Sequence, residues 1–110
     1  MYAATGPTRS LDILPGMDPI REHHILDVAI LVREAAAMND AALAQDLDES
    51  RFRAQLIAAR ADEAGYVDLA LAAAHLVLIL GSPGTTPSPG YGAGMLRVAD
   101  EVDALGFDLL

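Results

Sequence analysis

Residues 18–44 read DPIREHHILDVAILVREAAAMNDAALA, and this stretch decides the fold class. Asp18 is suited to cap a helix. Pro19 is suited to its first position, because the first turn of a helix leaves that amide hydrogen unpaired in any case. Alanine and other strong helix formers fill most of the remainder. The sequence therefore predicts one long helix from about Pro19 to about Ala44.

This predicted helix is apolar on more than one side. One stripe, at three- and four-residue spacing, consists of Ile25, Val28, Ala29, Val32, Ala36 and Leu43. A second stripe beside it consists of Leu26, Ile30, Leu31, Ala35 and Met38. A helix that is apolar over most of its circumference has to be covered on more than one side. Either it is the central helix of the fold, or it meets a second protein chain.

The middle of the chain predicts a pair of helices. The first follows Asp48 or Ser50, either of which can serve as its N-cap, and runs to about Ala64. Gly65 is suited to the left-handed position that ends many helices. The second helix spans about residues 67–80. A short connection of this kind favours antiparallel neighbours.

This pair resembles one helical hairpin of the tetratricopeptide type. The resemblance covers roughly residues 54–83 and implies two antiparallel helices joined by a tight turn. It rests on small residues in the first helix, glycine at the turn and alanine early in the second helix, at Ile57, Ala58, Ala61, Gly65, Val67, Ala70, Ala74 and Pro83. The large aromatic residues of such repeats are absent and no second copy follows, so the resemblance indicates a helical hairpin only.

The last part of the chain predicts a loop and a fourth helix. Residues 81–94 are rich in glycine and proline, and a helix over about 93–105 follows, with Gly106 at its end. The aliphatic run 76–80 can also be interpreted as a strand. We therefore predict an all-α, four-helix bundle-like single domain over residues 18–110. A flexible N-terminal arm of residues 1–17 precedes it.

The composition excludes several classes of function. The chain has no cysteine, which excludes disulfide scaffolds, thiolate metal sites and thiol nucleophiles. Its formal net charge is −9, and such a surface repels the phosphates of nucleic acids and of anionic membranes. We expect neither of these as a partner. The absence of cysteine and of a secretory leader favours a cytoplasmic location.

Residues 75–86, HLVLILGSPGTT, have the outline of a strand that enters a phosphate-binding loop. Such a loop needs a lysine that reaches the phosphates and a second glycine at fixed spacing. All seven basic residues of this chain are arginines, and the spacing fails as well. We therefore expect no nucleotide, and the sequence indicates no other cofactor.

The histidines are the remaining candidates for site chemistry. His23 and Asp27 are four residues apart on one helix face, but a catalytic zinc site needs three protein ligands and the third is missing. They are weak candidates, and we expect no metal. His75 is interpreted as a core or interface histidine with one hydrogen bond. The alternative is a ligand-binding or pH-sensitive contact of His75, together with Tyr91 in the following loop.

No catalytic set emerges, so we expect a small acidic protein–protein interaction module without catalysis. The partner would be a second copy, or a basic protein that this chain serves as adaptor, inhibitor or chaperone. The expected interaction residues are Ile25, Leu26, Ile30, Leu31, Met38, Leu76 and Leu80. An equally simple interpretation places all of them in the core. The alternative function is a small ligand-binding protein or enzyme with a pocket near His75 and the 81–94 loop.

Overall fold

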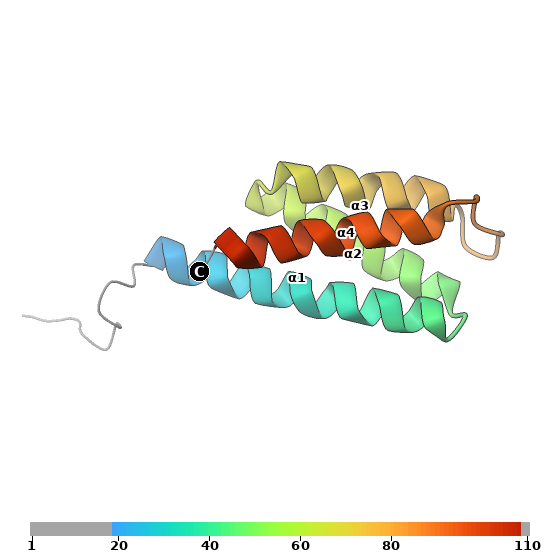
Figure 1. Cartoon of the computed structure of the whole chain (residues 1–110), viewed down its shortest axis with the longest axis horizontal. Coiled ribbons are helices and arrows are strands. Elements are labelled where there is room, and N and C mark those ends of the chain that lie inside the picture. Colours follow the sequence, from blue (N-terminus) through green and yellow to red (C-terminus); the bar gives the residue numbers. More distant parts are fainter. Residues whose placement is uncertain (1–18, 109–110) are drawn as a thin grey trace, which may run out of the picture.

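The computed structural model describes residues 19–108, and these residues form four α-helices and no strand. The helices are α1 (Pro19–Leu43), α2 (Leu47–Ala64), α3 (Val67–Leu80) and α4 (Tyr91–Asp108). They run alternately up and down and pack side by side as a bundle (Figure 1). The predicted all-α, four-helix architecture is confirmed, and residues 76–80 belong to a helix. The predicted arm of residues 1–17 and the expected N-cap Asp18 lie outside the described residues.

The four helices form a ring in which α1 occupies one corner. α1 packs along α2, α2 along α3, α3 along α4, and α4 returns to α1. The contact between α1 and α4 is the sparsest of the four, and α1 has no close backbone approach to α3 across the bundle. The expectation that the first helix is central to the fold is therefore wrong. Part of its apolar circumference faces outward, and Leu26 is 57% exposed.

The core is built from aliphatic and small side chains. Its large, fully buried members come from all four helices and are Leu31, Met38, Ile57, Leu69, Leu76, Leu80 and Val98. Buried alanines such as Ala54, Ala61 and Ala73 bring the helices close together. Removing these apolar surfaces from water supplies the main favourable free energy of folding. None of the described helices is long and apolar enough to cross a bilayer.

The turn between α1 and α2 is closed by Asp46. The Asp46 carboxylate accepts a hydrogen bond from the Glu49 amide at 3.1 Å, which satisfies a donor that the first turn of α2 leaves unpaired. The predicted caps, Asp48 and Ser50, are therefore wrong, because both lie within α2. Their side chains make contacts other than caps. The Ser50 hydroxyl donates to the Met38 carbonyl at 3.0 Å, and the Asp48 carboxylate contacts Arg51.

Glycines lie at the end of α2 and within α4, and each position has a different consequence. Gly65 adopts the predicted left-handed conformation, with φ of 83°, at the end of α2. Helix α4 is longer than predicted at both ends, and Gly106 lies inside it. At Gly94 a Cβ atom would lie only 3.1 Å from Cδ1 of Leu76, so the absence of a side chain lets α4 pack closely on α3.

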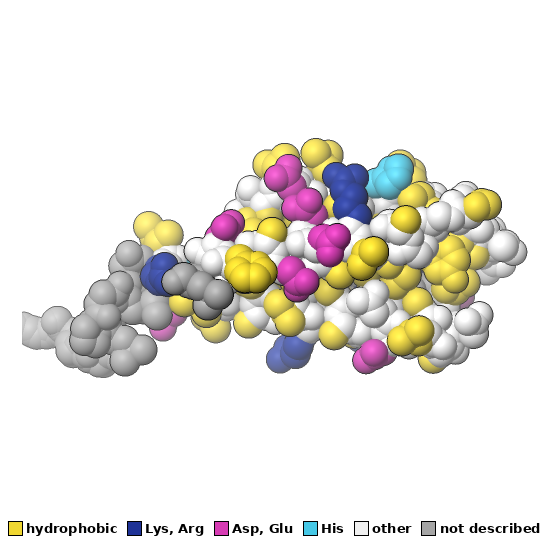
Figure 2. All heavy atoms as spheres, in the orientation of Figure 1, with side chains coloured by type: hydrophobic (Ala, Val, Ile, Leu, Met, Phe, Trp, Pro, Cys, Tyr) yellow, Lys and Arg dark blue, Asp and Glu magenta, His cyan; other side chains and the backbone are white. Residues whose placement is uncertain are grey.

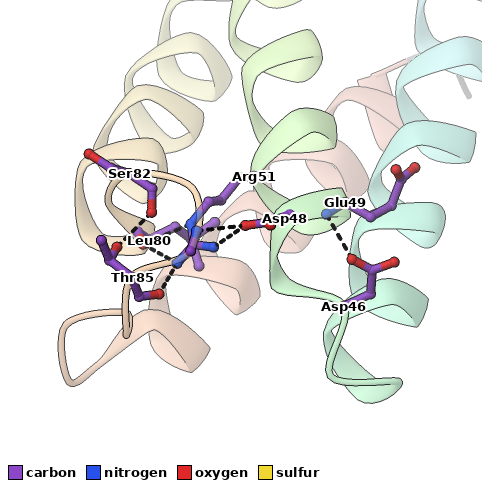
Figure 3. A network of polar contacts seen from close by, with 8 residues as sticks. Asp46, Asp48, Glu49, Arg51, Leu80, Ser82 and Thr85 are labelled. Atoms are coloured by element: carbon purple, nitrogen blue, oxygen red, sulfur yellow. Dashed lines mark hydrogen bonds and ion pairs between the residues drawn. The ribbon is translucent and has the colours of Figure 1, made fainter.

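A buried arginine joins α2 to the end of α3 and to the loop that follows (Figure 3). Arg51 is only 4% exposed. It donates from Nε and Nη2 to the Leu80 carbonyl, at 3.0 and 2.9 Å, and from Nη2 to the Thr85 carbonyl. Its Nη1 contacts the Asp48 carboxylate at 2.6 Å, and the same carboxylate accepts from the Gly84 amide. This network fixes the loop that leads into α4.

Candidate functional site

The residues expected to mediate an interaction divide between the core and the surface. Four of them are at most 1% exposed, namely Leu31, Met38, Leu76 and Leu80. These four are part of the core, as the second interpretation of the sequence proposed. Ile25 and Ile30 are partly buried, and Leu26 is well exposed. Of the predicted interaction residues on α1, Leu26 is therefore the one that is well exposed to solvent.

The two residues considered for ligand chemistry lie in different settings. His75 is exposed on α3, because the core-facing row of that helix passes through Ala72 and Leu76. The core position considered for His75 is therefore wrong, and its interface role stays a prediction. Tyr91, the first residue of α4, is partly buried and lines a groove, whereas His75 does not line it. Of the two candidates for a ligand contact, Tyr91 is thus the one that lies at this hollow.

The His23–Asp27 pair does not develop into a metal site. The Nε2 atom of His23 and a carboxylate oxygen of Asp27 are 3.5 Å apart. Arg60 lines the same surface hollow, and its cationic side chain disfavours a metal ion there. Within residues 19–108 no group of three or more histidine or carboxylate side chains is placed to hold a metal ion.

A groove opens between the C-terminal part of α1 and the N-terminal part of α4. The two helices diverge toward this end of the bundle (Figure 1), and the hollow between them measures about 480 Å³. Its lining residues are Asn39, Ala42, Leu43, Gln45, Tyr91, Gly92, Met95, Leu96 and Ala99. None of them carries a charge at neutral pH, although the chain as a whole has a net charge of −9.

Two matching rows of side chains flank this groove. The rows, which together we name the α1/α4 face, are Val32, Ala36, Asn39 and Leu43 on α1 and Leu96, Asp100, Asp103 and Phe107 on α4. In both helices the residues are spaced i, i+4, i+7 and i+11, so that each row follows one side of its helix. Figure 2 shows hydrophobic side chains on this side of the molecule, with acidic side chains among them over α4.

The antiparallel course of α1 and α4 puts the large apolar residues at the four corners of the face. Leu43 and Leu96 line the same groove. Val32 and Phe107 each lie eleven residues from these positions, which places both at the opposite end of the face, about 16 Å away. All four are exposed, by 49% at Val32, 83% at Leu43, 63% at Leu96 and 73% at Phe107.

The lining of this groove is largely apolar. It contains apolar carbons, two amide side chains and the Tyr91 hydroxyl, and it includes no histidine, carboxylate or arginine. Apolar side chains of a partner would lose water on entering the groove, and such burial favours binding.

A polar contact between Tyr66 and His24 lies at the end of the bundle opposite the groove. The Tyr66 hydroxyl is hydrogen-bonded to Nδ1 of His24, and the two rings meet edge to face with centroids 5.2 Å apart. Burial raises the pKa of Tyr66, and the nearby Asp27 carboxylate raises it further. The pair connects α1 to the start of α3, so we interpret it as a structural contact.

The sequence identified three of the four α1 residues of the α1/α4 face as apolar, but it did not identify the face. Val32, Ala36 and Leu43 belong to the first apolar stripe of the predicted helix, but they were not selected as interaction residues. Phe107 lies one residue beyond Gly106, where the sequence predicted the last helix to end. The signal that could have found the face is the identical spacing of the two rows. It becomes visible only when the last helix is extended to Asp108.

Comparison of the chain with protein-family models, with curated proteins and with solved structures found no match.

Proposed function

We propose that this protein is a helical interaction module that binds another protein chain through its α1/α4 face. The observation that carries the proposal is the set of four exposed corner residues, Val32, Leu43, Leu96 and Phe107, of which Leu43 and Leu96 line an uncharged groove. Contiguous exposed apolar patches bordered by polar residues are typical of protein-binding sites.

The position of the face within the bundle supports the same conclusion. It lies over the sparsest of the four contacts between helices, where α1 and α4 leave space between them. The core cluster draws side chains from all four helices and lies beneath this face. A partner that packs over the α1/α4 contact would bury the exposed corners and fill the hollow without disturbing the core.

Site-directed cross-linking tests this function. A photoreactive amino acid is placed at Leu96, and separately at Leu78, which is 78% exposed on α3 and is the matched control. Irradiation in the source cells is expected to give a discrete cross-linked protein species from position 96 and not from position 78. The species should disappear when the companion substitution Leu43→Glu is present. Equal cross-linking from both positions, or none from position 96, would contradict the proposal.

Binding of a small apolar ligand is a second candidate, favoured by the size and lining of the groove. A volume of about 480 Å³ lies within the range of ligand pockets, and Tyr91 offers a hydroxyl among apolar walls. The groove is open along its length, however, whereas ligand pockets enclose most of their ligand. Ala99→Phe would fill the groove and abolish binding of a fluorescent apolar dye there, while dye binding that survives this change would exclude the groove as its site.

A further inference from the structure

The α1/α4 face differs between its two helices in one respect, which is charge. The positions between the corners are Ala36 and Asn39 on α1, but Asp100 and Asp103 on α4. Both aspartates are exposed, and neither carboxylate has a hydrogen-bond or ion-pair partner among residues 19–108. The uncharged groove lies at the Leu43 and Leu96 end of the face. Asp100 and Asp103 follow on α4 toward Phe107, so two available negative charges continue the face beyond the groove.

We propose that the occupant of this groove is an amphipathic helix of another protein that carries basic residues beside its apolar row. This inference rests on the proposed function and specifies the partner's chemistry. The apolar row of that helix packs between the four corners. Its arginine or lysine side chains reach Asp100 and Asp103 along one edge.

The shape of the face favours a helix over a second copy of this chain. A groove between two helices accepts the convex apolar side of a third helix, which is a common mode of peptide recognition. An isologous dimer would place the same patch against itself, so that one groove faces another. Where the two grooves face each other directly, the hollow of about 480 Å³ on each side has no convex element to fill it, and unfilled space forfeits packing contacts.

Charge favours the same occupant. Two copies would each bring a net charge of −9 to the interface, together with their own Asp100 and Asp103. Like charges brought together in this way suppress association, whereas a basic helix meets complementary charge. The length of the rows also fits, because eleven residues of a partner helix extend about 16 Å, the distance between opposite corners.

Two labelled synthetic peptides of about 18 residues, long enough to form a helix, test the inference. Both carry leucine at i, i+4, i+7 and i+11. One has arginines beside this row, and the other has glutamates at the same positions. Fluorescence anisotropy measures their affinity for the wild-type chain at about 50 mM and about 500 mM salt. The basic peptide is expected to bind more tightly, and to lose affinity at the higher salt concentration.

Matched variants locate the binding. Asp100→Asn with Asp103→Asn is expected to weaken binding of the basic peptide by about twofold to thirtyfold, the range for two exposed charge pairs. Asp62→Asn with Glu63→Gln removes the same charge from α2 and is expected to change its affinity much less. Asp100→Arg with Asp103→Arg is expected to reverse the preference toward the acidic peptide. Circular dichroism confirms that each variant remains helical.

The outcomes separate this inference from the proposed function. Equal affinity of the two peptides, with loss of both in Leu43→Glu plus Leu96→Glu, overturns the inference but supports the apolar face. An equal effect of the two charge-neutralising variants shows non-specific attraction and also overturns the inference. If the leucine substitutions change neither peptide's affinity, both proposals fail. If neither peptide binds and the chain is a dimer that Leu96→Glu dissociates, a second copy covers the face and the inference is overturned.

Discussion

Arg51 is the one buried charged side chain among residues 19–108. It extends from α2 to the end of α3 and donates to the main-chain oxygens of Leu80 and Thr85. These bonds add to the one that the Gly81 amide donates to the Val77 carbonyl at the same helix end. Arginine suits this position because its planar group reaches several acceptors at once. One residue of α2 thereby positions the loop from which α4 begins.

We expect Arg51→Met to lower the free energy of unfolding by about 2–4 kcal/mol, because the carbonyls it now satisfies would lose a charged donor in a largely buried place. Methionine keeps much of the apolar side chain, so the change reports mainly on the hydrogen bonds. Urea denaturation measures the loss. Arg60→Met, at an exposed position of α2, is the control and should change stability far less. Equal effects of the two substitutions would show that the network contributes nothing particular.

Asp48 gives the same network a dependence on acid. The Gly84 amide, and next the Arg51 guanidinium, hold the pKa of the Asp48 carboxyl below its ordinary value. A lowered pKa in the folded state contributes stability that is present above the ordinary pKa. That contribution is lost as the pH falls through the lowered pKa of the folded state.

The stability difference between the wild type and Asp48→Asn is therefore expected to stay constant from pH 7 to about pH 5. It should shrink below about pH 4, where the carboxyl of the unfolded chain takes up its proton, and vanish once the folded carboxyl is protonated as well. Urea denaturation across this pH range measures the difference. Asp62→Asn, at an exposed position without such contacts, should show no comparable change. A difference that remains constant down to about pH 2 would contradict the assigned role of Asp48.

At the scale of elements, the closeness of α3 and α4 depends on Gly94. A helical glycine costs up to about 1 kcal/mol relative to alanine, so the presence of Gly94 inside α4 needs a reason. Here a Cβ atom would meet Cδ1 atoms of Leu76 and Ile79 at 3.1 and 3.5 Å. Leu76 is fully buried and has little room to move aside. Gly106 lies in the same helix with nothing within 4 Å of its notional Cβ.

This contrast predicts opposite outcomes for one substitution. We expect Gly106→Ala to raise the free energy of unfolding by a few tenths of a kcal/mol, up to about 1, because alanine favours helix and nothing obstructs it. Gly94→Ala should gain little or nothing, because the contact with Leu76 offsets the helical preference. Thermal and urea unfolding of both variants measure the difference. Equal stabilisation by the two would show that α3 and α4 can separate freely.

The sequence predicted those elements that depend on neighbouring residues better than those that depend on distant contacts. The span of α3 and the turn at Gly65 follow from apolar spacing and from glycine's freedom at positive φ. The start of α2 was misplaced, because several acidic residues near it could cap a helix equally well. The role of Arg51 could not be identified, since its main-chain acceptors lie 29 and 34 residues away and are brought to it only when α2 and α3 are packed.

The candidate site shows the same limit at a larger scale. Each row of the α1/α4 face can be read from its own helix, as spacing of i, i+4, i+7 and i+11. The face itself depends on the antiparallel course of α1 and α4 and on which end of the bundle they leave open. Both are properties of the packed molecule. Selecting interaction residues by hydrophobicity alone therefore returned core residues such as Leu31 and Met38.

At the scale of the whole molecule, self-association and partner binding make opposite demands on salt. A net charge of −9 on each copy opposes association of this chain with itself, and added salt screens that repulsion. Binding of a basic helix is instead weakened by salt, because the attraction to Asp100 and Asp103 is screened. The same face therefore gives salt dependences of opposite sign for the two kinds of occupant.

We expect the isolated protein to be monomeric by light scattering after gel filtration, at low salt and over a wide range of concentration. Raising the salt should do no more than allow weak self-association at the highest concentrations. Leu96→Glu, at an exposed corner of the face, should leave the low-salt mass and the helical content unchanged, and Leu78→Glu on α3 serves as its control. A stable dimer at low salt that Leu96→Glu dissociates and Leu78→Glu does not would show that repulsion is overcome at this face. The groove would then be covered by a second copy, because the isolated protein offers no other occupant. The apolar contact at Leu96 would outweigh the charge repulsion, which is strongest at low salt.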